Sequence, residues 1–130
     1  MSATMRREGY AAAARVRREQ LLDLAEDVAA REEVALIHAP AAATVMLEVE
    51  GPVGAFCLTE VVITTVSVDV AGRAGWAAVL GYDEEGALAA AILDSTPSAP
   101  AEALAGEALA AEAAARAEQA ALVGATKVGE

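Results

Sequence analysis

Reactive side chains are scarce in this 130-residue chain, which has one cysteine and one histidine. The lone Cys57 excludes an intrachain disulfide and favours a reducing compartment, and no apolar leader is visible, so we expect a cytoplasmic protein. A zinc site needs three or four thiolate or imidazole ligands, and the chain offers only His38 and Cys57. No Gly-rich phosphate loop or hydrolase motif occurs. We therefore expect no catalytic, metal-binding or cofactor-binding residues on this chain.

Basic residues are also few: nine Lys and Arg stand against twenty Asp and Glu, for a net charge of −11. Most of the basic residues lie within residues 1–31, so the remainder of the chain is strongly acidic. This balance argues against nucleic acid and against an anionic membrane as direct partners. Charges interrupt every apolar run too early for a membrane span. An acidic body suits a basic protein partner, and it also serves solubility.

Aromatic residues make up only 3% of the chain, although 56% of it is apolar and much of that is alanine. Because an alanine side chain buries little area, the core of a monomer should be marginal in stability. A partner that covers additional surface would remedy this. Compositional drift toward alanine is the alternative explanation.

Hydrophobic spacing predicts one domain over residues 1–130, with an α+β fold in which N-terminal and C-terminal helices pack on a small antiparallel sheet. Residues 1–33 read as one or two helices. Residues 34–81 read as antiparallel strands, with breaks at Pro40 and at the turn 51–54, a hairpin loop at 71–73, and the strongest strand at 60–70. A helix capped by Asp83 follows over 83–95, then a linker over 96–100 and a helix over 101–123.

Five residues stand out as weak ligand or interface candidates. His38 ends an apolar run and could be a general base or a partly exposed residue, and Glu60 opens the longest strand. The only tryptophan, Trp76, reads as core, or as an interface anchor if it is exposed. Cys57 reads as a small core residue. The full candidate set is His38, Glu60, Thr64, Arg73 and Trp76.

Several segments, taken in order, resemble the PhnG family. They are HAPAAATVM (38–46), FCLTEVVITTVSV (56–68), GRAGWAAVLGYDEEGALAAAILDS (72–95) and ATKV (125–128). This sequence has His38 where the family carries an arginine and Ala43 where it carries a glycine.

The resemblance implies a supporting subunit of the carbon–phosphorus lyase core complex, with PhnI-, PhnH- and PhnJ-like partners. Such a complex makes a ribose 1-phosphonate 5-triphosphate from ATP and a phosphonate. The resemblance places the iron–sulfur cluster and S-adenosylmethionine of the later cleavage on a partner subunit, so this chain is expected to hold no cofactor.

Two other functions are compatible with the residues alone. One is a small-ligand-binding or regulatory module with a pocket on the sheet face, lined by Val62, Thr64, Val66 and Trp76. The other is a stand-alone enzyme that uses His38 and Glu60.

Overall fold

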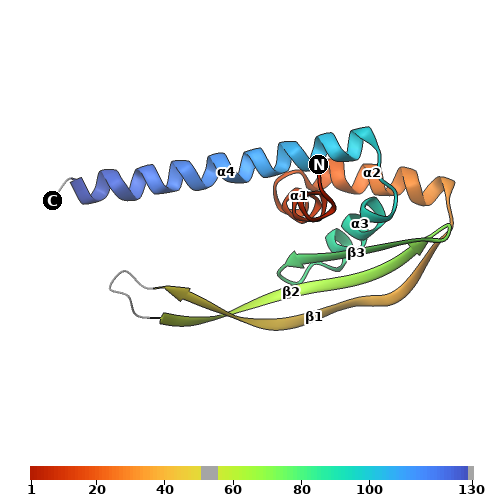
Figure 1. The fold of residues 1–130 in the computed structure, drawn as a ribbon, viewed down its shortest axis with the longest axis horizontal. Helices are drawn as coiled ribbons and strands as arrows, with labels where there is room; N and C mark the ends of the chain where they lie inside the picture. Colours follow the sequence, from red (N-terminus) through yellow and green to blue (C-terminus); the bar gives the residue numbers. More distant parts are fainter. Residues whose placement is uncertain (51–55, 129–130) are drawn as a thin grey trace.

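The computed structural model describes the backbone of residues 1–50 and 56–128 and the side chains of residues 1–46 and 60–121. Over these residues the chain forms four α-helices and a three-stranded antiparallel sheet, which confirms the α+β class. Figure 1 shows α3 lying directly on the sheet, with α1, α2 and α4 above it. The elements in chain order are α1 (Ala3–Val16), α2 (Arg18–Arg31), β1 (Val34–Glu50), β2 (Phe56–Val70), β3 (Arg73–Leu80), α3 (Glu84–Ser95) and α4 (Ala99–Val128).

The N-terminal segment forms two helices that meet at a single residue. Ser2 caps α1, because its Oγ accepts a hydrogen bond from the Met5 N–H at 3.1 Å. Arg17 ends α1 with φ −142° and ψ 44°, and α2 starts at the next residue. The side chains buried along α2 recur at helical spacing, at Leu21, Ala25 and Val28. The two helices therefore turn their apolar sides toward the same core.

The sheet has the order β1-β2-β3, and the predicted break at Pro40 is wrong because β1 runs straight through it. The pairing of β1 with β2 is irregular between His38 and Ala41, which is where Pro40 lies. Proline is tolerated at such a site on an edge strand, since no ladder hydrogen bond needs its missing N–H. The turn predicted at 51–54 and the predicted core role of Cys57 lie outside the described residues.

The β2–β3 hairpin has a two-residue loop, so the predicted loop over 71–73 is one residue too long. Ala71 and Gly72 both have positive φ, at 50° and 87°, as a type I′ hairpin turn requires. The Asp69 carboxylate accepts a hydrogen bond from the Gly72 N–H at 2.8 Å. Arg73 already pairs with Val70 and belongs to β3.

The last two helices differ from the predicted bounds at the linker. Asp83 caps α3 as expected. The linker spans only residues 96–98, because α4 begins at Ala99 and continues to Val128 instead of spanning 101–123. Ser98 accepts a hydrogen bond from the Ala101 N–H at 3.2 Å, and Pro100 sits in the first turn, where a helix needs no N–H.

The core lies between one face of the sheet and the helices, and it consists largely of alanine. The backbones consequently approach closely. A Cβ added to Gly75 in β3 would lie 2.2 Å from the Ala91 oxygen in α3. A Cβ added to Gly9 in α1 would lie 2.5 Å from the Ala105 Cβ in α4. The largest fully buried side chains are those of Tyr10, Leu21, Thr64, Val66, Val68, Val70, Val79 and Leu93.

Two segments extend from this body on the same side: the far end of the β1–β2 hairpin and the C-terminal half of α4 (Figure 1). The side chains of residues 41–46 in β1 and 113–121 in α4 are exposed. These described residues therefore gain little stability from packing on the body, and an isolated helix in water is marginal.

Candidate functional site on the uncovered face of the sheet

The two faces of the sheet have different surroundings. In β2, Thr64, Val66, Val68 and Val70 point to the helices and are buried. Because side chains alternate along a strand, the odd-numbered residues of β2 from Val61 to Asp69 point the other way, where the described chain places no helix (Figure 1). We call this side the uncovered face.

Two of the five candidates, His38 and Trp76, lie on this face in one cross-strand row. His38 of β1 pairs with Ser67 of β2, and Ser67 pairs with Trp76 of β3. Neighbouring strands are about 4.8 Å apart, so the backbones of His38 and Trp76 are separated by about 10 Å. The row places an imidazole, a hydroxyl and an indole side by side.

Toward the far end of the β1–β2 hairpin, the uncovered face is largely apolar. The next rows toward the hairpin end are Ala78–Thr65–Ala41 and Leu80–Ile63–Ala43. Leu80 is 49% exposed and Trp76 is 43% exposed. Exposed apolar side chains that are contiguous on a soluble domain mark an interaction surface.

The prediction that Trp76 belongs to the core is wrong. Its neighbours Gly75 and Ala77 occupy the inward positions of β3, where α3 approaches too closely to admit an indole. The side chain instead meets Arg7 of α1, whose guanidinium carbon lies 5.8 Å from the ring centroid in a cation–π contact. An exposed and restrained tryptophan is the kind of residue that anchors protein interfaces.

Asp94 holds this arrangement together. Its Oδ2 accepts a hydrogen bond from the Trp76 N–H at 2.9 Å, and Arg7 Nε lies 3.2 Å from its Oδ1 and 3.1 Å from its Oδ2. Asp94 lies at the C-terminal end of α3, where the helix dipole disfavours an acid. The arginine and the strand N–H compensate for that position. By accepting a hydrogen bond from this N–H, Asp94 also covers part of the open edge of β3.

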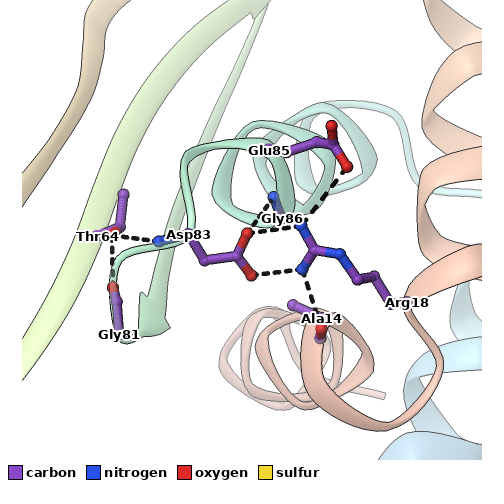
Figure 2. A network of polar contacts seen from close by, with 7 residues as sticks. All are labelled: Ala14, Arg18, Thr64, Gly81, Asp83, Glu85 and Gly86. Carbon is purple, nitrogen blue, oxygen red and sulfur yellow. Dashed lines mark hydrogen bonds and ion pairs between the residues drawn. The ribbon is translucent and has the colours of Figure 1, made fainter.

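Thr64 and Arg73 have structural contacts. Thr64 is fully buried; its Oγ1 donates to the Gly81 carbonyl at 2.6 Å and accepts from the Asp83 N–H at 3.0 Å (Figure 2). Arg73 donates to the Ser95 carbonyl and to Thr96 Oγ1, both at 3.1 Å, and forms an ion pair with Glu32. Thr64 thus fixes the β3–α3 connection, and Arg73 connects the end of α3 to the end of α2.

The arginine–aspartate pair beside Thr64 was not predicted from the sequence. Arg18 Nη1 and Nη2 lie 2.7 Å and 2.8 Å from the two carboxylate oxygens of Asp83 (Figure 2). Asp83 also accepts from the Gly86 N–H at 2.9 Å, which makes it the cap of α3. The hydrogen bond from Arg18 lowers the pKa of Asp83 below its usual range, against partial burial. Only the capping role had a local signal, because the two partners are 65 residues apart.

The remaining combinations of candidates are not brought together. Glu60 and Ser67, the partner of His38, are seven residues apart in β2, so about 23 Å separates them and they point to opposite faces. A joint active site of His38 and Glu60 is therefore wrong. The sheet-face pocket is also wrong, because Thr64 and Val66 face the helices while Trp76 faces away from them.

Two further findings concern the described residues only. Among them, no group of three or more His, Cys, Asp or Glu side chains is placed to hold a metal ion. None of the helices formed by the described part of the chain is both long enough and apolar enough to cross a membrane.

Comparison with family models identifies the family to which the chain is similar. The model of the family described as phosphonate metabolism protein PhnG matches residues 4–129, which is nearly the whole chain. No curated protein matches the sequence significantly.

Proposed function

Because the chain belongs to the PhnG family of phosphonate metabolism proteins, we propose that it is a supporting subunit of the carbon–phosphorus lyase core complex. In this proposal it works in the cytoplasm with PhnI-, PhnH- and PhnJ-like subunits. Together they convert ATP and a phosphonate to a ribose 1-(methyl)phosphonate 5-triphosphate. The chemistry, including the iron–sulfur cluster and S-adenosylmethionine of the later step, belongs to the partner subunits.

The uncovered face is the observation that carries the proposal. It combines a restrained, exposed tryptophan with Leu80, Ile63 and small apolar residues, and a lone chain leaves it in water. Burial of apolar surface yields about 25 cal/mol per Å², so covering this face would contribute strongly to association. Interfaces of permanent complexes are apolar in this way.

The two extending segments support the same proposal. The hairpin end carries exposed Val45 and Met46, and residues 113–121 of α4 are exposed where the helix extends from the body (Figure 1). A helix of this composition is stabilised when it packs against another protein. Both segments extend on the same side and would reach around one partner.

Co-expression with the PhnI-, PhnH- and PhnJ-like proteins tests the proposal. The wild-type chain should co-purify in one assembly that releases adenine from ATP in the presence of methylphosphonate. The double variant Trp76→Asp/Leu80→Asp should lose at least about tenfold in affinity for the assembly, since it places two charges at the centre of an apolar interface. Met5→Asp, at an equally exposed apolar residue on α1, is the matched control.

Two results would overturn the proposal. One is a stable, monodisperse wild-type monomer that ignores all three partners. The other is full assembly by the double variant. His38→Gln separates support from catalysis: in the assembled complex it should leave the rate and the pH profile of adenine release unchanged, whereas a lost titration near neutral pH would make His38 a catalytic residue.

A further inference from the structure

A groove lies between α2 and α3, away from the uncovered face. Its volume is about 590 Å³. Each helix lines it with one stripe of side chains spaced three or four residues apart, as one face of a helix requires. The residues lining it are Glu19, Leu22, Asp23, Ala25, Glu26 and Ala29 of α2, and Glu85, Leu88, Ala89 and Ile92 of α3.

The floor of the groove is apolar and its rim is acidic. Leu22 and Leu88 are half-buried, and Ile92 below them is 5% exposed. The rim carboxylates are exposed and come from both helices: Glu19, Asp23 and Glu26 from α2, and Glu85 from α3.

The charge of the rim is largely unbalanced. Glu85 lies 3.5 Å from Arg18, whose main partner is Asp83 (Figure 2). Within the described part of the chain, no Lys or Arg forms an ion pair with Glu19, Asp23 or Glu26. No basic residue lines the groove. The groove therefore has a net negative potential above a floor that water wets poorly.

We propose that the α2/α3 groove binds a basic amphipathic helix of a partner protein. A helix presents apolar residues at i, i+3 or i+4, and i+7, which match a floor made by Leu22, Leu88 and Ile92. Lysine and arginine on either side of that stripe meet the carboxylates on both rims. The lining of α2 from Glu19 to Ala29 covers eleven residues and a rise of about 15 Å, which fits about three turns of a docked helix.

The geometry favours a helix over an extended peptide. A strand needs an open sheet edge for its main-chain hydrogen bonds, and two helices offer none. A third helix laid between two others completes a packing unit that close-packs apolar side chains. A second copy of this chain is disfavoured, because two chains that each carry a net charge of −11 repel one another.

The inference goes beyond the proposed function and does not need it. The probe is a synthetic peptide of about 15 residues with Leu at i, i+3, i+4 and i+7 and Lys elsewhere, long enough to form helix on binding. A scrambled peptide of the same composition and a Leu/Glu peptide are the peptide controls. Titration calorimetry on the full chain gives the affinity, and backbone amide NMR shifts locate the site.

The triple variant Glu19→Gln/Asp23→Asn/Glu26→Gln should weaken binding of the Leu/Lys peptide at least about tenfold. Its matched control is Glu8→Gln/Glu33→Gln/Glu118→Gln, which removes the same charge at exposed sites outside the groove and should change affinity less than about twofold. Leu22→Ser should also weaken binding. Raising NaCl to about 1 M should abolish most of the charge-dependent part.

The inference is overturned if the scrambled peptide binds as tightly, or if both triple variants lose affinity equally, because attraction would then follow net charge alone. Shifts confined to the uncovered face would overturn it too. So would a groove already covered in a dimer of this chain, detected by sedimentation. Groove variants that still assemble with the phosphonate-processing partners separate this result from that of the proposed function.

Discussion

Arg18 donates two parallel hydrogen bonds, of 2.7 Å and 2.8 Å, to the carboxylate of Asp83, which lies 65 residues away in the sequence. The pair joins the first residue of α2 to the cap of α3, and the same arginine donates to the Ala14 carbonyl at 3.3 Å near the end of α1 (Figure 2). One guanidinium thus connects three helices.

Substitutions at Asp83 should separate its two roles. Asp83→Asn keeps a good helix cap and loses the charged pair, while Asp83→Ala loses both. We expect Asp83→Ala to lower the free energy of unfolding by about 2–3 kcal/mol and Asp83→Asn to cost about half of that. Urea denaturation followed by circular dichroism measures both. Equal losses in the two variants would contradict a capping role.

The same pair predicts a loss of stability in acid. The hydrogen bond from Arg18 lowers the pKa of Asp83 in the folded chain, so its contribution is present above the pKa of an unfolded aspartate, about 3.9, and disappears as the pH falls through the lower folded value. Asp83→Asn should flatten that part of the profile of unfolding free energy against pH below about 4. A profile as steep as that of the wild type would refute the linkage.

Two glycine substitutions should act in opposite directions. Gly75→Ala places a Cβ 2.2 Å from the Ala91 oxygen and 2.9 Å from the Ser95 nitrogen, and backbone cannot move aside cheaply. We expect it to cost about 3 kcal/mol or more. Gly106→Ala in α4 meets only the end of Met1, at 3.8 Å, and should stabilise the chain by about 0.5–1 kcal/mol. Thermal denaturation of both variants provides the comparison.

Replacing Tyr10 by phenylalanine should make the folded chain more stable. Its ring is 1% exposed, and its hydroxyl has no hydrogen-bond partner among the described residues. Tyr10→Phe should therefore raise the free energy of unfolding by about 1 kcal/mol, whereas Tyr10→Ala should lower it by about 3–5 kcal/mol. A loss of stability in Tyr10→Phe would reveal a partner for the hydroxyl.

Alkaline denaturation gives a second readout at the same residue. Burial raises the pKa of the Tyr10 phenol, with Arg6 opposing and Asp94 and Glu102 adding to the rise. Because the pKa of Tyr10 is higher in the folded chain than in the unfolded chain, its neutral phenol contributes to the free energy of unfolding. This contribution is fully present below about pH 10, the unfolded value, and is lost as the pH rises through the folded value. Tyr10→Phe should remove that loss in urea melts taken through this range.

Asp94 covers part of the open edge of β3 by accepting a hydrogen bond from the Trp76 backbone N–H, and its removal should expose that edge. Asp94→Ala leaves the Trp76 N–H without its acceptor and Arg7 without its partner, so we expect a cost of about 1–3 kcal/mol. Asp94→Asn keeps an acceptor and should cost less. The alanine variant should also self-associate more, since strand edges pair with other edges. Analytical ultracentrifugation would show whether it does.

Patterns that depend on near neighbours could be predicted. Alternating β-branched residues placed the strand at 60–70, and the acidic stretch after Tyr82 placed the start of α3 at its cap, Asp83. Period and capping are local properties, so the α+β class followed from them. The placement of His38 and Trp76 in one cross-strand row could not be predicted in this way, since it depends on the register of two strand pairs.

The predictions that failed did so for two physical reasons. The predicted breaks at Pro40 and Pro100 are wrong because an edge strand and a first helical turn both leave the proline nitrogen without a required hydrogen bond. The predicted core position of Trp76 is wrong because the close approach of β3 and α3 at Gly75 leaves no space for an indole between them. Such a contact between distant segments has no signature in either segment alone.

The contact at Gly75 has a mechanical result. With no side chain between β3 and the Ala91 oxygen of α3, there is no compressible layer to absorb a displacement. The uncovered face and the floor of the α2/α3 groove are therefore rigidly connected, because α3 packs directly on β3 and also lines the groove. Each would meet its partner in a shape it already has, so little conformational entropy would be lost when either one docks.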